Sequence, residues 1–255
     1  MKDPTDYNVR AVERALQILS SFDDQHTERG LSEIAQGVDL HKATTHRLVT
    51  TLVNYGYLER TDGQKYRLGL RLTDLGYKAI RRMDLRREAL PYMTQLSQQL
   101  EEACDLSIFD RGEVFYIEYV PGPHALTVAA AVGQHLPAYC TASGKLLLAN
   151  LPPDKLNAYL EHPLVAYTDK TITSPEKLRQ QLDEVRERGY AVDDEELEEG
   201  IRAVSAPICN RRGEISASIS VPGPTSRMTK DRIPQIAQAL RETARTISRR
   251  MGCIS

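Results

Sequence analysis

Cationic and hydrogen-bonding side chains recur at helical spacing near the start of this 255-residue chain. No carboxylate interrupts their face of the helix, which carries Lys42, Ala43, His46, Arg47 and Thr50, with Thr44 at its flank. Guanidinium, ammonium, imidazole and hydroxyl groups so arranged can donate hydrogen bonds to the base edges and phosphates of DNA. The ordinary alternative is the solvated polar face of a helical hairpin, which contains the same residue types.

Two predicted helices hold this face outward. Apolar residues and Thr45 repeat with a helical period over 45–52, which predicts a helix that begins near His41. The same period over 31–38 predicts a shorter helix that ends at Gly37, because glycine accepts the left-handed backbone of a sharp exit. Two short helices joined by a few residues indicate a helix-turn-helix.

A β-hairpin is predicted directly after the second helix. Extended runs at 58–60 and 65–68 flank Asp62-Gly63, a pair that favours a turn in which both central residues take positive φ. We expect the basic hairpin residues to contact phosphates or enter the minor groove. They are Arg60, Lys65 and Arg67. Helices and hairpin in this order predict a winged helix-turn-helix whose second helix lies in the major groove of DNA.

Charge and composition agree with a regulated DNA-binding protein. The whole chain has a net charge of −2, but residues 38–71 contain six basic and three acidic residues. A local basic patch on a weakly acidic chain favours such a protein over one that coats DNA. Hydrophobic residues make up 41% and charged residues 27%, as in ordinary globular proteins, and the length allows two domains.

The sequence predicts a cytoplasmic protein with no membrane partner. It contains no apolar run long enough to cross a bilayer, and its first residues, MKDPTDYNVR, lack the hydrophobic core of a secretion signal. The four cysteines form no CxxC pair, so we expect reduced thiols. They are Cys104, Cys140, Cys209 and Cys253.

Helical segments flank the predicted DNA-binding module. A helix over 9–19 should pack on the other two through Val9, Val12, Leu16 and Leu19. Residues 71–102 also read as helical, with a break before Pro91, which suits the first turn of a helix. Apolar residues at the start of this segment favour pairing with a second copy of the chain; a plain linker is the alternative.

The second half predicts an α+β domain, an antiparallel sheet with flanking helices. One helix should begin at Ser174-Pro175 and end at Gly189, because serine caps helices and glycine terminates them. The other expected helices cover 141–151, 154–160 and 231–251. The expected strands cover 106–110, 114–119, 126–132, 190–192, 203–209 and 214–221.

Small residues gather at one predicted helix start, within Gly133–Lys145. Unpaired N–H groups and the helix dipole favour an anion there, and we expect no carboxylate of the chain beside them. A small carboxylic acid is therefore a candidate ligand. Helix capping by Thr141 or Ser143 with tight packing is an equally good explanation.

Other chemistry is less well supported by the spacing. Cys140 could act as a nucleophile with His135 as base, but no third orienting residue is evident and cysteine often fills cores. His124, His135 and Cys140 match no compact zinc pattern, so we expect no metal and no cofactor.

Two polar runs in the second half could also reach a ligand. The acidic run 193–199 should be a solvated loop, although one member could point inward at a ligand hydroxyl. Ser216, Ser218 and Ser220 alternate on one strand face, which fits either a bound polar ligand or an exposed face of the sheet.

Six stretches together resemble the IclR family of bacterial transcriptional regulators over nearly the whole chain. They are GLSEIAQGVDLHKATTHRLVTTLVNYGYLER, KYRLGLRLTDLG, GQHLPAYCTASGKLLLA, TITSPEKL, GYAVDDEELEEGIRAVSAPI and ISVPGPTSRMT. KYRLGLRL, TITSPEKL and ARTISRRMG are most similar to the members that regulate pectin and sugar-acid catabolism.

The resemblance implies a winged helix domain (1–70), a linker helix (71–84) and a GAF-like effector domain (85–255). It implies dimers, often paired into tetramers, on pseudo-palindromic double-stranded operators. Most members repress catabolic genes in response to a small organic acid, and some activate them. The family's recognition helix often opens with Pro-Lys-Ser-Thr, where this chain has His41-Lys42-Ala43-Thr44, so the operator should differ.

The resemblance also implies an effector pocket against the start of the helix at 140–144. Asp193 and Ser220 match glyoxylate-binding positions of some members, whereas Ala203 and Pro222 replace a frequent cysteine and serine. These replacements remove polar contacts and argue against glyoxylate. The expected effector-binding residues are Cys140, Thr141, Ala142, Ser143, Gly144, Asp193, Ala203, Ser218 and Ser220.

We therefore expect a DNA-binding regulator, most simply a repressor controlled by a small organic or sugar acid. Its expected DNA contacts are His41, Lys42, Thr44, His46, Arg47, Arg60, Lys65 and Arg67. Two other classes compete with this prediction. One is an enzyme that acts on an organic acid and retains a vestigial DNA module; the other is an adaptor that binds proteins through residues 41–50.

Overall fold

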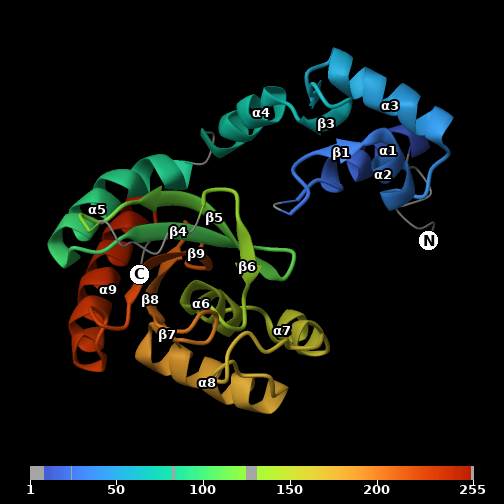
Figure 1. Ribbon diagram of the computed structural model, residues 1–255. Helices are drawn as coiled ribbons and strands as arrows, with labels where there is room; N and C mark the ends of the chain where they lie inside the picture. Colours follow the sequence, from blue (N-terminus) through green and yellow to red (C-terminus); the bar gives the residue numbers. More distant parts are fainter. Residues whose placement is uncertain (1–8, 24, 82–83, 125–130, 254–255) are drawn as a thin grey trace. The chain divides into compact units, whose positions relative to one another are not determined.

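The computed structural model describes residues 9–23, 25–81, 84–124 and 131–253 (Figure 1). The chain forms two compact units, Met1–Arg82 and Met83–Ser255, and each is described here by itself.

The first unit is a winged helix-turn-helix, as the sequence predicts. A three-stranded antiparallel sheet in the order β1-β3-β2 accompanies its helices. Its elements are α1 (Arg10–Ser20), β1 (Arg29–Gly30), α2 (Leu31–Gly37), α3 (Lys42–Asn54), β2 (Leu58–Arg60), β3 (Lys65–Leu68) and α4 (Leu70–Arg81). Ile18, Ile34, Val49 and Leu58 form the buried centre that joins α1, α2, α3 and the hairpin.

Two turns of this unit differ from the sequence prediction. Helix α2 does end at Gly37, but the left-handed residue is Asp39, with φ of 47°. In the hairpin, Gln64 takes the positive φ of 57°, and its N–H donates to the Thr61 carbonyl over 3.1 Å. The predicted hairpin is confirmed, but the positive φ expected at Asp62 and Gly63 is wrong, because a left-handed residue after them closes the turn.

The expected packing face of α1 is confirmed at Leu19, which packs against the core, and is wrong for its other three residues. Val9, Val12 and Leu16 are 57–65% exposed, whereas Ile18 is fully buried. Helix α1 contacts α3 through the side that bears Ile18. Its sequence offers two apolar stripes, and periodicity alone does not say which one faces the core.

The second unit is a six-stranded antiparallel sheet with helices on both faces, in the order β6-β5-β4-β9-β8-β7 (Figure 1). Its helices are α5 (Asp84–Leu100), α6 (Ala142–Ala149), α7 (Pro153–Leu160), α8 (Pro175–Arg188) and α9 (Ile233–Arg250), with a short 3₁₀ helix at Lys230–Arg232. Its strands are β4 (Cys104–Asp110), β5 (Glu113–Val120), β6 (His135–Pro137), β7 (Ala191–Asp194), β8 (Ile201–Cys209) and β9 (Ile215–Pro224). The predicted α+β class is confirmed.

Two hydrophobic cores lie on opposite faces of this sheet. One contains Leu96 of α5 and Leu240 of α9. These two helices contact each other, and α5 packs on β4 and β5 while α9 packs on β8 and β9 (Figure 1). The other contains Leu146 of α6 and Leu182 of α8. The predicted ends of α8 are confirmed, since the Ser174 hydroxyl accepts from the Lys177 N–H and Gly189 is left-handed, with φ of 72°.

Three sequence predictions for this unit need correction or qualification. Pro91 lies inside α5 rather than at a helix start. It removes one helical N–H, but buried residues of α5 on both sides pack in the core and keep the helix continuous. Residues 126–130 of the expected strand 126–132 lie outside the described residues, residues 131–132 are not in a strand, and β6 follows at His135–Pro137. Cys209 and Cys253 form a disulfide, so only Cys104 and Cys140 have the expected free thiols.

Candidate functional site

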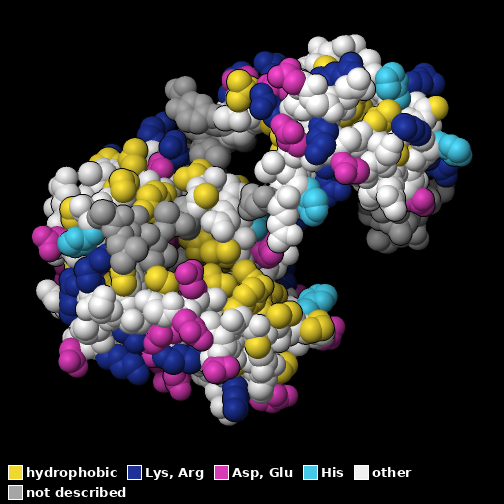
Figure 2. All heavy atoms as spheres, viewed as in Figure 1, with side chains coloured by type: hydrophobic (Ala, Val, Ile, Leu, Met, Phe, Trp, Pro, Cys, Tyr) yellow, Lys and Arg dark blue, Asp and Glu magenta, His cyan; other side chains and the backbone are white. Residues whose placement is uncertain are grey.

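Helix α3 presents the cationic face to solvent. Lys42, His46 and Arg47 are exposed, as is His41 at the helix N-cap, whereas Thr45 and Val49 on the opposite side are fully buried. Ala43 and Thr50 are exposed as well, and Thr44 is half-buried. Lysine, arginine and histidine side chains gather over the α3 part of the unit (Figure 2). Burial of one stripe therefore fixes which side chains the helix offers to a partner.

The basic residues of the hairpin differ in their surroundings. The Arg67 guanidinium donates to the Glu59 carboxylate of the adjacent strand, with distances of 3.0 and 3.1 Å to Oε2. Arg60 and Lys65 are exposed, and no ion pair among the described residues involves either of them. Arg60 and Lys65 are thus available for phosphates, while Arg67 is held by its own strand neighbour.

A cavity of about 160 Å³ lies at the start of α6 in the second unit. Six of the sequence-predicted effector residues line it: Thr141, Ala142, Ser143, Asp193, Ala203 and Ser220. The other lining residues are Asp105, Tyr116, Gln134, Leu136, Leu197, Glu198, Ile201 and Pro222. They were not among the expected effector contacts, although Pro222 stood at a family pocket position and Gln134, Leu136, Leu197 and Glu198 lay in runs that the sequence singled out; Asp105, Tyr116 and Ile201 gave no signal.

Three predicted effector residues lie near the cavity without lining it. Cys140 is buried, and its thiol lies 3.9 Å from the Pro137 carbonyl. A Cβ at Gly144 would lie 2.2 Å from the Ala138 carbonyl oxygen, so glycine is required there for packing. Ser218 is fully buried in the sheet, and its hydroxyl has no hydrogen-bond partner among the described residues.

A chain of hydrogen bonds joins the start of α6 to the sheet. The Ser143 hydroxyl donates to Ser220 Oγ over 3.0 Å, and the Ser220 hydroxyl donates to the Asp105 carboxylate. Asp105 and Ser220 are cross-strand partners on β4 and β9. The exposed-face explanation therefore holds for Ser216 alone, since Ser218 and Ser220 are buried.

Two acidic side chains of the cavity are buried. Burial raises the pKa of Asp105 to about 7, and the hydrogen bond from Ser220 opposes this rise only in part. Burial also raises the pKa of Asp193 to about 7, although its Oδ1 accepts the Glu196 N–H over 2.8 Å. The expectation that no carboxylate lies beside this helix start is therefore wrong.

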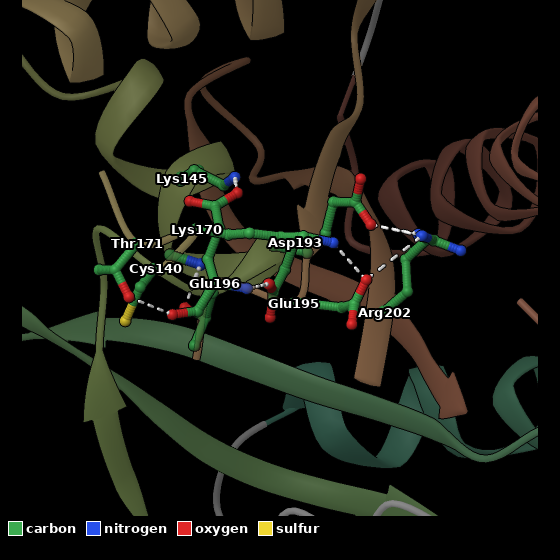
Figure 3. Close-up of polar contacts among 12 residues, drawn as sticks. Cys140, Lys145, Lys170, Thr171, Asp193, Glu195, Glu196 and Arg202 are labelled. Atoms are coloured by element: carbon green, nitrogen blue, oxygen red, sulfur yellow. Dashed lines mark hydrogen bonds and ion pairs between the residues drawn. The ribbon is translucent and has the colours of Figure 1, made fainter. Parts of the chain in front are cut away.

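Residues 193–196 of the acidic run, which begins in β7, are anchored rather than solvated (Figure 3), whereas Glu198 and Glu199 are exposed as expected. The Lys145 ammonium and the Glu196 carboxylate form a buried ion pair. Arg202 binds Asp194, and Lys170 binds Glu195. Because β-strand side chains alternate, Asp193 points into the cavity while its neighbour Asp194 points to Arg202.

The surroundings of Cys140 argue against a nucleophilic role. Burial, followed by the nearby Asp193 and Glu196 carboxylates, raises the pKa of the Cys140 thiol to about 12, so it stays protonated at neutral pH. His135 does not serve as its base; the ring nitrogen lies 3.4 Å from Asp110. In the part of the chain that the structure describes, no three His, Cys, Asp or Glu side chains are placed to hold a metal ion.

Known proteins match both units of the chain. A family model described as "IclR helix-turn-helix domain" matches residues 11–62, and one described as "Bacterial transcriptional regulator IclR C-terminal" matches residues 77–249. The "HTH-type transcriptional regulator XynR" of Escherichia coli K12 is 36% identical over 96% of this chain and 98% of its own length. The "HTH-type transcriptional regulator KdgR" of the same organism is 35% identical over 96% of this chain and 94% of its own.

A solved structure gives the same fold. An IclR homologue from Microbacterium hydrocarbonoxydans, complexed with 4-hydroxybenzoate, superposes with a TM-score of 0.83 at 29% identity, over 94% of this chain and 98% of its own. Among the described residues, no helix is both long enough and apolar enough to span a membrane. The matched proteins are transcriptional regulators, which excludes the enzyme hypothesis.

Proposed function

The chain belongs to the IclR family of bacterial transcriptional regulators, and from this premise we propose a cytoplasmic repressor of a catabolic operon that a small carboxylic acid controls. The observation that carries the DNA-binding part is the orientation of α3, with its cationic face exposed and its apolar stripe buried. A helix held in this way can enter the major groove.

Each basic residue has a proposed role at the operator. Arg47 binds a guanine edge, since its guanidinium matches the two acceptors of that base. Further contacts in the major groove come from His41 at the N-cap of α3 and from Lys42, Thr44 and His46. Arg60 and Lys65 bind phosphates and so fix the register of the protein on the duplex. Arg67 can bind a phosphate only by leaving Glu59, so we assign it a weaker contact.

The test is Arg47→Ala, measured against an operator fragment and against random DNA at the same salt concentration. We expect operator affinity to fall about tenfold or more while random-DNA affinity changes little, because the loss of a base contact weakens binding by about 1–3 kcal/mol. The matched control is Arg245→Ala, at an exposed arginine of α9. Equal losses on both DNAs would place Arg47 on phosphate instead.

The proposed effector site is the cavity at the start of α6. Its volume of about 160 Å³ suits a ligand of roughly benzoate size, because a cavity of about 150 Å³ is known to hold benzene. The N–H groups at the start of α6 attract a carboxylate, and Ser143, Ser220 and Asp193 offer partners for hydroxyl groups. The 4-hydroxybenzoate complex of the Microbacterium homologue supports an acid ligand for this chain.

Helix α4 supplies the proposed link between effector and DNA. We propose residues 71–84, of which α4 covers those up to Arg81, as the linker between a DNA-binding domain (1–70) and an effector domain (85–255), and we propose a homodimer or a dimer of dimers. An effector shifts the DNA-bound state only if it binds one arrangement of the dimer more tightly than another.

A further inference from the structure

The cavity at the start of α6 is rich in carboxyl groups and poor in cations. Asp105, Asp193 and Glu198 line it, and none of its described lining residues is Lys, Arg or His. The buried ammonium of Lys145, which does not line the cavity, already forms an ion pair with Glu196. An effector carboxylate therefore enters a space whose described lining carries carboxyl groups and no cation.

Of the two buried acids, Asp105 has fewer neighbouring groups that stabilise its ionised form. Asp193 accepts a backbone N–H from Glu196, and the Lys145 charge also stabilises its ionised form. Asp105 is 2% exposed, and a single hydroxyl, that of Ser220, donates to it. A carboxyl group with so few donors is readily held in its neutral form.

The groups around Asp105 supply no compensating positive charge. The titratable neighbours are Tyr116 on β5, Asp193 on β7 and, next to Asp105 on β4, the buried Cys104. On the α6 side the facing group is the neutral Ser143 hydroxyl, reached through Ser220. Burial raises the pKa of the Tyr116 hydroxyl and of the Cys104 thiol well above their ordinary values, so both stay neutral.

We propose that Asp105 selects the effector by charge: a monocarboxylate binds together with one proton on Asp105, and a dicarboxylate is excluded. This inference rests on the proposed effector site. In the bound state the protonated Asp105 donates a hydrogen bond to the effector, directly or through Ser220, as buried neutral carboxyl groups do in other sites. A second effector carboxylate would have to face Asp193 or Glu198, and like charges so close disfavour ionisation.

The proton balance gives a measurable pH dependence. The pKa of Asp105 of about 7 means that about half of the free protein carries this proton at pH 7. Binding completes the protonation, so about half a proton is taken up from solvent per effector at pH 7. Effector affinity should fall about tenfold from pH 6 to pH 8, because the competent, protonated fraction falls by that factor.

The experiment is isothermal titration calorimetry on the full chain with three matched pairs of probes: lactate and malate, gluconate and glucarate, 4-hydroxybenzoate and terephthalate. In each pair the second probe carries a second carboxylate, in place of a hydrogen in malate, of the CH2OH group in glucarate and of the hydroxyl group in terephthalate. We expect a monocarboxylate to bind more tightly than its partner. For that probe, buffers of different ionisation enthalpy should report about half a proton taken up at pH 7.

Asp105→Asn is the decisive variant, because the amide keeps the size of the side chain and donates a hydrogen bond at every pH. Its affinity for the bound probe should change less than about twofold between pH 6 and pH 8. The comparison is Asp193→Asn, which changes the other buried acid of the cavity, and the pH dependence should be lost more completely in Asp105→Asn than in Asp193→Asn. Circular dichroism verifies folding, and the wild-type proton count tests the inference even if a variant misfolds.

The possible failures are distinguishable. If no probe binds the wild type at any of these pH values, the proposed effector cavity fails, and the inference with it. If a probe binds with no proton uptake, if Asp105→Asn keeps the wild-type pH dependence, or if the dicarboxylates bind more tightly, the role of Asp105 is overturned and the effector cavity stands.

Discussion

Replacement of Asp105 by asparagine should change the pH dependence of stability even without an effector. An aspartate has an ordinary pKa of 3.8, and burial raises that of Asp105 to about 7 in the folded state. The folded protein therefore binds more protons than the unfolded chain between these pH values. The stability that the neutral carboxyl contributes is fully present below the ordinary pKa of 3.8 and is lost as the pH rises through about 7.

The size of this effect follows from the pKa difference. Each unit corresponds to about 1.4 kcal/mol, so the full range is on the order of 4 kcal/mol. About 2 kcal/mol of it falls between pH 5.5 and pH 8, where the protein is convenient to study. Asparagine does not titrate. Between pH 5.5 and pH 8, the free energy of unfolding should therefore fall by about 2 kcal/mol less in the variant than in the wild type.

Urea unfolding of the full chain, followed by far-ultraviolet circular dichroism at both pH values, measures the difference. The control is Asp169→Asn, the same substitution at an exposed loop aspartate of the same unit. It separates the effect of burial from that of the substitution itself. Equal losses in the wild type and in Asp105→Asn would refute the reasoning, because Asp105 would then be ionised in the folded state throughout this range.

Three further predictions concern the two proposed sites. Lys65→Ala should reduce the slope of log affinity against log salt by about one for DNA binding; an unchanged slope would remove the hairpin contact. Gly144→Ala should lower unfolding free energy by about 1–3 kcal/mol or more, because its Cβ would overlap the Ala138 carbonyl, and an unchanged melting temperature would contradict that packing. Ser220→Ala combined with Asp193→Ala should blunt effector response while operator affinity stays at the wild-type level; full induction would place the effector elsewhere.

The DNA-binding unit could be predicted largely from sequence because its information is local. The helical stripe over 45–52 determines both which side of α3 is buried and which side is exposed. Helix α1 shows the limit of that reasoning. It has a second apolar stripe, led by Val12 and Leu16, and only the packing against α3 distinguishes the two.

The effector cavity could be predicted only in part because it combines distant segments. The small residues at the start of α6 are adjacent in sequence and gave a signal, although it fitted helix capping as well as a ligand. Asp105 gave none, since an acidic residue in an alternating strand usually faces solvent, and its burial depends on pairing with Ser220, 115 positions away. The disulfide escaped prediction for a similar reason, because α9 must pack against β8 before Cys253 can reach Cys209.

The stability and binding measurements on Asp105 must agree with each other. If an effector binds the protonated protein more tightly than the ionised protein, the proton binds more tightly to the effector-bound protein by the same factor. The pKa inferred from the loss of stability thus fixes the pH at which effector affinity begins to fall. A binding curve that bends at a different pH would identify a second titrating group, and Asp193, the other buried acid of the cavity, is then the residue to replace.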